Sequence, residues 1–407
     1  MRLTARRLPY LLLALTCLAG WLFKAHCGAS WAGDEQYLAG CYSDAVPFWG
    51  LRGVAAGRLP YVEAPIEYPV LTGALIWLEG LVVRTIGGAR GDAFDFLLVV
   101  SMVNAALAFA VLRMMEAAGV PRVRLLWWAT APPLVLYLGH NWDMLAVALA
   151  VAALLAARRG EQASAAALAA IGTAAKLFPV LLLPLLGLGA MFGRGAGLRL
   201  GDGLRLAAIV ILFWAALNLP IALVAFENWR EFYVFSSQRS GTAGSIWEIM
   251  QVQGWWITDI PTRNLWSFAL FAGGAAAIVA LGWRRHHPHL WVLFTPVLAW
   301  FLLTNKVYSP QFDLWLYPFL LLTSRRLWPV AWFALGDLAA YWTEFWWFAS
   351  PGGSGPGVTP AHIAIAAAFR AAAMLWIIVE GVRAPPSWLI PPPAAFPPPE
   401  GRPIPAG

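Results

Sequence analysis

The chain has 407 residues, of which 60% are hydrophobic and only 12% are charged, with a formal net charge of +7. Soluble globular chains carry about 25% charged residues and roughly 45–50% apolar ones. The composition therefore excludes an ordinary soluble protein and predicts an all-α, polytopic membrane protein.

Apolar segments follow one another along almost the whole chain. A straight helix needs roughly 20 residues to cross the hydrocarbon core of a bilayer, and several of these segments are shorter than that. We expect about 11–13 transmembrane helices. The segments cover residues 8–24, 68–83, 96–115, 123–139, 143–157, 163–176, 177–192, 204–225, 265–283, 289–304, 311–323, 327–348 and 361–382.

The first apolar segment follows a basic start that contains Arg2, Arg6 and Arg7. The sequence Ala25–His26–Cys27 after it lacks the small-residue pattern of a signal-peptide cleavage site. We therefore expect this segment to be retained as the first transmembrane helix. Because Lys and Arg accumulate in short cytoplasmic loops, the N-terminus is predicted to be cytoplasmic.

The later arginine clusters orient the other segments. They all fall on the cytoplasmic side if residues 68–83 do not cross the membrane. Glu79 suits a surface position for this segment, because a carboxylate at the bilayer centre costs about 2.5–3.5 kcal/mol. We predict twelve crossings with both termini cytoplasmic; alternatively, 68–83 crosses and 163–192 crosses only once. The clusters are Arg113/Arg122/Arg124, Arg158/Arg159, Arg194/Arg199/Arg205, Arg284/Arg285, Arg325/Arg326 and Arg383.

With this topology, the side chains suited to chemistry gather on the outer side, opposite the arginines. Two large outer loops, residues 25–95 and 226–264, contain most of the carboxylates, and shorter turns contain His, Asn, Lys and Tyr. Ionisable residues at membrane level often mark substrate paths. We therefore expect a single membrane domain, residues 1–383, whose outer loops form the active-site face.

Two cysteines, Cys27 and Cys41, lie in the first outer loop. On an oxidising face they could form a disulfide, or they could remain free thiols.

The cytoplasmic side offers little chemistry. His286, His287 and His289 are close enough in sequence to suggest a metal site, but beside two arginines at the inner membrane edge we interpret them as contacts to lipid head groups, and no metal is expected. The proline-rich tail, residues 384–407, is predicted to be an extended, disordered cytoplasmic segment.

Carboxylates on one face, with Lys and Arg on neighbouring turns, suit one kind of reaction. A carboxylate can act as general base for a sugar hydroxyl that attacks an activated donor. Cations can stabilise the departing phosphate. The chain shows no phosphate-binding glycine loop and no dinucleotide fingerprint. We therefore expect a lipid-phosphate donor that arrives within the bilayer, and no cofactor.

Several short motifs resemble glycosyltransferase family 87. This family includes the polyprenol-phosphate-mannose-dependent mannosyltransferases of actinobacteria and belongs to the GT-C superfamily of multi-span enzymes. The resemblance covers about residues 8–380, and it departs from the family where Val70 stands in place of a second proline after Pro69. The motifs are Tyr42–Ser43–Asp44, Gly57–Arg58–Leu59–Pro60–Tyr61, Glu67–Tyr68–Pro69–Val70–Leu71, Asn141–Trp142–Asp143, Lys176–Leu177–Phe178–Pro179 and Asn305–Lys306–Val307–Tyr308–Ser309–Pro310–Gln311.

The resemblance implies a GT-C-like fold with a large first external loop, in the cell membrane. It implies an inverting transfer of a sugar, mannose by default, from a polyprenyl-phosphate sugar to a cell-envelope glycolipid or polysaccharide. An Asp of the first outer loop is then the general base; we favour Asp44, with Asp34 as the alternative. Membrane lipids are expected partners and nucleic acid is not. The candidate substrate-binding residues are Tyr61, Glu67, Tyr68, His140, Asn141, Asp143, Lys176, Arg230, Asn305, Lys306, Tyr308 and Gln311.

Other interpretations remain open at this point. Lys306 could be an interfacial anchor, and Asp143 could be a helix N-terminal charge. The donor sugar could be arabinose. The protein could also be a transporter of lipid-linked sugars or a scaffold. Transporters often show internal repeats and charged residues on broken helices at mid-membrane. No repeat is evident here, which favours the enzyme.

Overall fold

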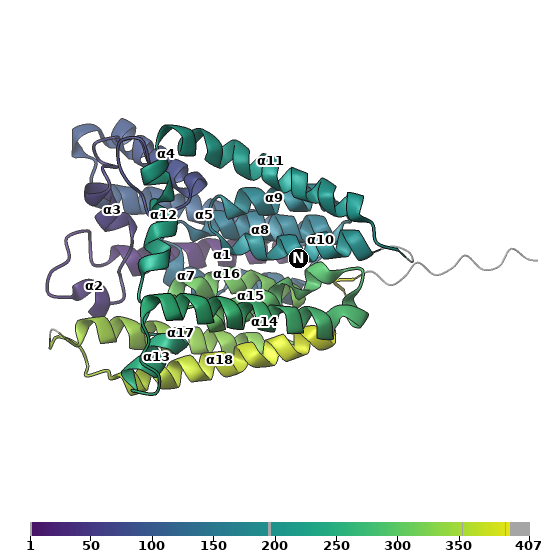
Figure 1. The fold of residues 1–407 in the computed structure, drawn as a ribbon. Helices are drawn as coiled ribbons and strands as arrows, with labels where there is room; N and C mark the ends of the chain where they lie inside the picture. The colour runs from purple at the N-terminus through teal and green to yellow at the C-terminus, as the bar shows by residue number, and fades with distance from the viewer. Residues whose placement is uncertain (1, 194–196, 352, 387, 391–407) are drawn as a thin grey trace, which may run out of the picture.

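The computed structural model describes residues 2–193, 197–351, 353–386 and 388–390. The described residues form α-helices and short 3-10 helices, without a β-strand. Figure 1 shows the longer helices running side by side as a bundle, so the all-α prediction is confirmed. The longest are α1 (Arg2–Ala25), α4 (Val70–Gly87), α5 (Ala93–Ala117), α11 (Leu200–Val224), α14 (Ile260–His286), α17 (Trp328–Ala349) and α18 (Pro360–Arg383).

Six helices among the described residues are long and apolar enough to cross a membrane. The protein is therefore a helical membrane protein, as the composition predicts. The six are Arg7–Ala25 within α1, α4, α5, α11, α14 and α18. Whether α4 and the shorter helices cross stays a prediction.

Several predicted segments are broken into shorter helices at prolines. The segment expected at 123–139 consists of α6 (Arg122–Ala129) and α7 (Pro132–Tyr137), with Ala131 in extended conformation between them. Proline restricts the residue before it to extended backbone and cannot donate a hydrogen bond to the preceding turn. The other shorter elements are α8 (Asp143–Arg158), α9 (Gln162–Thr173), η2 (Phe178–Leu181), α10 (Leu182–Phe192), η3 (Leu290–Leu293), α15 (Phe294–Thr304), η4 (Pro310–Phe312) and α16 (Asp313–Thr323).

The bundle has two different ends. We call the end where α2 (Glu35–Leu38), α3 (Ala45–Leu51), α12 (Phe226–Gln238) and α13 (Ile246–Val252) lie the loop end; it is on the left in Figure 1. Contacts between distant segments hold its loops together. Ser354 donates to Asp34 at 2.9 Å, Asn228 donates to the Tyr61 carbonyl at 2.5 Å, and the backbone N–H of Asp44 donates to the His140 carbonyl at 2.8 Å.

The opposite end, which we call the basic end, gathers arginines from separate segments. Arg124 donates to the carbonyls of Leu321 and Ser324, both at 2.7 Å. Arg158, Arg199 and Arg205 line a cavity of about 370 Å³. Several of the arginines that the sequence assigns to the cytoplasmic side therefore lie at this end, although other arginines, such as Arg52 and Arg263, lie at the loop end.

Helix α4 lies at the loop end. Trp142, which directly precedes α8, contacts Tyr68 before α4 and Phe96 in the first turn of α5, with ring centroids 5.4 and 6.2 Å apart. The same indole donates to Glu79 in the middle of α4 at 2.6 Å. The start of α4 and the start of α5 therefore lie near the same indole, and whether α4 crosses the membrane stays a prediction. Glu79 itself is buried against protein, so its carboxylate is not a surface group.

Two expectations about the cytoplasmic side are wrong. His286 is buried and its ring bonds to the Val382 carbonyl at 3.0 Å, so it does not lie among lipid head groups. The tail is packed at its start, because Leu389 is fully buried and Arg158 donates to its carbonyl at 3.0 Å. Apolar side chains at 388–390 explain this packing within a proline-rich stretch. Residues 391–407 lie outside the described residues.

Cys27 and Cys41 are joined in a disulfide, which closes a loop with a sequence separation of 14. The bond connects the end of α1 to the segment immediately before Asp44. Of the two predicted alternatives, the disulfide is therefore the correct one. Among the described residues, Cys17 is the free cysteine, and it is buried.

A labelling experiment tests the orientation of the bundle. Ser240 at the loop end and Arg285 at the basic end are both exposed. In a Cys17→Ala background, Ser240→Cys should react with an impermeant thiol reagent in intact cells, and Arg285→Cys should react only after permeabilisation. Equal labelling of both in intact cells would contradict the predicted topology.

Candidate functional site

A cavity of about 650 Å³ lies at the loop end. Its walls come from the segment between α1 and α4, the turns near residues 140 and 176, α12 with the loop after it, the 305–312 turn and the end of α17. Segments far apart in sequence therefore meet around one polar space. The predicted site residues that line it are Asp44, Glu67, Tyr68, His140, Lys176, Asn305, Lys306 and Gln311.

Asp44 is held in place by both its backbone and its side chain. Its N–H donates to the His140 carbonyl at 2.8 Å, and its Oδ2 accepts from the Tyr68 hydroxyl at 2.8 Å. Burial raises the pKa of the Asp44 carboxyl above its ordinary value, opposed by hydrogen bonds from Tyr68 and Tyr42 and by the charge of Lys176. A raised pKa moves a carboxylate towards the range where it accepts a proton efficiently.

Asp34, the alternative base, lies elsewhere. It precedes α2 in a left-handed conformation with φ of 64°, and its Oδ2 accepts from Ser354 in the 350–359 loop. It does not line the cavity. The geometry therefore favours Asp44, and Asp34 connects the segment before α2 to the 350–359 loop.

Lys176, which is partly buried, and Asp143, which is fully buried, form an ion pair. Their Nζ and Oδ1 atoms are 2.8 Å apart, and Asp143 also accepts from the Trp315 indole at 2.7 Å. The Lys176 ammonium lies 4.5 Å from the centre of the Tyr68 ring. Asp143 is also the first residue of α8, where a negative charge is favourable. The ion pair thus holds Lys176 against the Tyr68 ring, whose hydroxyl bonds to Asp44. Asp143 itself does not line the cavity.

Two other cations of the cavity have no carboxylate partner. Lys306 Nζ donates to the Ser237 carbonyl at 2.8 Å, and neither Lys306 nor Arg239 forms an ion pair within the described part of the chain. Burial lowers the pKa of Lys306 to about 8, with further lowering by Arg239 and Arg263. Two neighbouring cations without a counter-ion favour binding of an anion.

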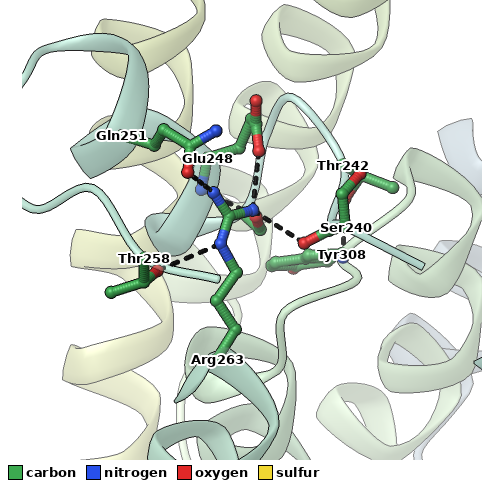
Figure 2. Close-up of polar contacts among 8 residues, drawn as sticks. Ser240, Thr242, Glu248, Gln251, Thr258, Arg263 and Tyr308 are labelled. Atoms are coloured by element: carbon green, nitrogen blue, oxygen red, sulfur yellow. Dashed lines mark hydrogen bonds and ion pairs between the residues drawn. The ribbon is translucent and has the colours of Figure 1, made fainter. Parts of the chain in front are cut away.

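Arg263 fixes the loop that carries Arg239. Figure 2 shows this guanidinium, from the first turn of α14, at the centre of the loop between α12 and α14. It donates to the Ser240 carbonyl at 2.7 Å, to Glu248 at 2.8 Å, to Thr258 at 3.2 Å and to Gln251. The same loop reaches the 305–312 turn, because the Tyr308 N–H donates to Thr242 at 2.7 Å.

Replacement of Arg263 should therefore loosen the loop that carries Arg239 and, through it, the 305–312 turn that carries Lys306. We expect Arg263→Gln to destabilise the protein by about 2 kcal/mol, since it removes several charge-assisted hydrogen bonds of a buried side chain. Thermal unfolding and protease cleavage of residues 239–259 measure this. Arg285→Gln, an exposed substitution on the same helix, is the control. Equal melting temperatures and equal cleavage would show that Arg263 does not hold the loop.

Four other predicted site residues support the cavity or lie away from it. Tyr61 donates to the Tyr68 carbonyl at 2.8 Å, and Asn141 accepts from the Asp143 N–H at 3.0 Å. Tyr308 is buried, with the Arg370 guanidinium 3.9 Å from its ring centre. Arg230 is half exposed and pairs with Glu227. None of the four lines the cavity.

The remaining predicted residues line the cavity with their own partners. Glu67 accepts two hydrogen bonds from Arg52, both at 2.7 Å. Asn305 donates to the Val307 carbonyl at 2.8 Å, within its own turn. Burial lowers the pKa of His140 well below its ordinary value, so its ring is neutral. The Gln311 side chain lines the wall and makes no hydrogen bond to another described residue.

Sequence reasoning missed several cavity residues. Arg239 stands in the loop after α12, which is predicted to be external, and the excess of arginine in cytoplasmic loops would not explain an arginine there. Glu344 interrupts an apolar segment, and an isolated carboxylate there is itself a signal. The aromatic residues Tyr37, Tyr42, Phe345 and Phe348 gave no signal in a chain with 24 Trp, 10 Tyr and 22 Phe.

Comparison with protein-family models gives no match for this chain, and comparison with curated proteins gives none either.

Proposed function

We propose that this protein is a membrane glycosyltransferase of the GT-C type, similar to family 87, that uses a polyprenyl-phosphate sugar as donor. The observation that carries this proposal is the composition of the cavity. It combines a positioned carboxylate of raised pKa, Asp44, with two cations that lack a carboxylate partner, Arg239 and Lys306. The first can take a proton and the others can hold a phosphate.

The reaction follows from these positions. A hydroxyl oxygen of the acceptor attacks the anomeric carbon of the donor sugar while its proton passes to the Asp44 carboxylate. The bond from the anomeric carbon to the phosphate oxygen breaks, and the lipid phosphate leaves with the electron pair. Arg239 and Lys306 stabilise its charge. A single displacement of this kind inverts the anomeric configuration.

Tyr68 and Lys176 act through Asp44. The Tyr68 hydroxyl donates to Asp44 Oδ2 and so directs the other oxygen of the carboxylate away from the tyrosine. Lys176, 4.5 Å from the Tyr68 ring centre and paired with Asp143, fixes that ring. The three residues are positioning groups, and the pair leaves Lys176 partly neutralised, so phosphate binding falls to Arg239 and Lys306.

The same proposal sets the location and the partners. The protein lies in the cell membrane with both termini cytoplasmic, and the cavity opens on the external face. The donor arrives laterally in the bilayer, and the acceptor is a cell-envelope glycolipid or polysaccharide. Mannose is the sugar that the resemblance implies, and no nucleotide, metal or nucleic acid takes part.

Purified protein should be incubated with labelled polyprenyl-phosphate mannose and a membrane lipid extract. The expected result is a new labelled glycolipid that is absent when Asp44→Asn is used. A parallel reaction with the arabinose donor distinguishes the two sugars. A transporter of lipid-linked sugars would give no product with either donor, yet would move the labelled lipid across a liposome membrane.

A further inference from the structure

Glu344 is a second carboxylate of the cavity, for which the proposed reaction has no role. It lies near the end of α17, lines the cavity wall and is 1% exposed. The Gly244 backbone approaches it, but neither carboxylate oxygen completes a hydrogen bond in the described structure. A buried, unsatisfied carboxylate is costly and rare in native proteins, which indicates a ligand-binding role.

Arg370 does not satisfy this carboxylate. Arg370 Nη1 pairs with Asp313 at 2.8 Å, and its Nη2 has no hydrogen-bond partner in the described structure. A Cβ placed on Gly244 would lie 2.0 Å from Glu344 Oε1 and 3.5 Å from Arg370 Nη2. An acceptor group and a donor group therefore lie beside the same glycine. A hydroxyl group, which both donates and accepts, matches this pair.

The wall next to Glu344 is aromatic. Phe345 lies 6.1 Å from His140 and 6.4 Å from Tyr42, and Tyr37 lies 5.5 Å from Phe348, all between ring centroids. All five side chains line the cavity. Pockets for small ligands combine aromatic walls with a few placed polar groups. A sugar ring has an apolar face for such a wall and hydroxyls for the carboxylate.

The polar loop after α12 connects this aromatic wall to the two cations, Arg239 and Lys306. A Cβ on Gly241 would lie 3.0 Å from the Lys306 carbonyl, whereas one on Gly244 would meet Glu344. The four residues 241–244 thus run from the phosphate side of the cavity to the carboxylate. A sugar bonded to a phosphate held by Arg239 and Lys306 would lie beside this stretch.

We propose that Glu344, with the aromatic wall of Tyr37, Tyr42, His140, Phe345 and Phe348, forms the subsite that binds the hydroxyl-bearing ring of the donor sugar. This inference rests on the proposed function, because the phosphate fixes where the sugar lies. It adds a specificity determinant to the site: the Glu344 carboxylate accepts hydrogen bonds from hydroxyls of the transferred ring.

Two short-chain probes test this. Farnesyl phosphate carries the phosphate without a sugar, and farnesyl-phosphoryl mannose carries both. Titration calorimetry of the purified protein should show tighter binding of the second probe. Glu344→Gln should reduce this sugar-dependent gain by about three- to tenfold, the usual effect of losing a hydrogen bond. Its affinity for farnesyl phosphate should not change.

The controls separate the possible failures. Glu161→Gln, an exposed carboxylate in a salt bridge with Arg159 outside the cavity, should behave as wild type. Phe345→Leu keeps an apolar side chain but removes the flat face, and should also lose the sugar-dependent gain. If Glu344→Gln keeps the gain, or if the wild type binds both probes equally, the subsite assignment is wrong while the donor class stands. If the wild type binds neither probe, the proposed donor class is wrong and the subsite falls with it.

Discussion

Asp44→Asn should abolish most of the transfer activity, with a loss of at least about 100-fold in kcat. The carboxamide keeps the shape of the side chain and can still accept a hydrogen bond from Tyr68, but it cannot take the proton of the attacking hydroxyl. Binding of the donor should be unchanged, because Arg239 and Lys306 are intact. Initial rates with labelled donor, together with donor affinity by calorimetry, measure the two effects separately.

The matched control is Asp34→Asn. This carboxylate belongs to the same segment between α1 and α4 but contacts Ser354 and lies outside the cavity. We expect a rate within a few-fold of wild type. A larger loss for Asp34→Asn than for Asp44→Asn would exchange the two roles. Full activity of both variants on a confirmed substrate would rule out a first-loop aspartate as the base.

The pH dependence follows from the same carboxylate. The base must be deprotonated, so kcat/KM falls as the pH falls through the pKa of Asp44. Because burial raises this pKa above the ordinary value of 3.8, the acidic fall should occur at a higher pH than for a solvent-exposed aspartate.

The fold could be predicted from the sequence where the signal is local. The length of the apolar segments predicted the helices. Prolines such as Pro132 divide some of these segments, because proline cannot donate a backbone hydrogen bond to the preceding turn. Asp92 and Asp95, which look like further outer-loop carboxylates, form the capping box of α5. Whether the two residues cap a helix depends on the residue at which α5 begins, and the sequence does not fix that residue.

The site was harder to predict, because the role of a charged side chain depends on which side chains it contacts in the folded protein. Lys176 and Lys306 look alike in the sequence, yet one is paired with Asp143 and the other faces Arg239 without a carboxylate. Arg230 and Arg239 stand on the same outer segment, but only Arg239 lines the cavity. These differences come from contacts over many residues, which no local pattern contains.

Lys306→Ala should weaken donor binding about 10- to 100-fold, because a charge-assisted hydrogen bond to phosphate contributes about 1.5–3 kcal/mol. The loss should appear in KM and in the affinity for farnesyl phosphate, with little effect on thermal stability. Arg239→Ala should act in the same way. Arg230→Ala, an exposed cation paired with Glu227 on the neighbouring α12, is the control and should change the affinity little.

The low pKa of Lys306 gives a sharper form of this test. Its ammonium is charged below its pKa of about 8 and loses that charge above it. The free protein should therefore bind the donor less well as the pH rises through about 8, so kcat/KM should fall on the alkaline side. Lys306→Arg keeps its charge across this range and should remove the alkaline fall. If Lys306→Arg retains the fall, or if Lys306→Ala binds farnesyl phosphate as tightly as wild type, Lys306 is an interfacial anchor and the phosphate is held elsewhere.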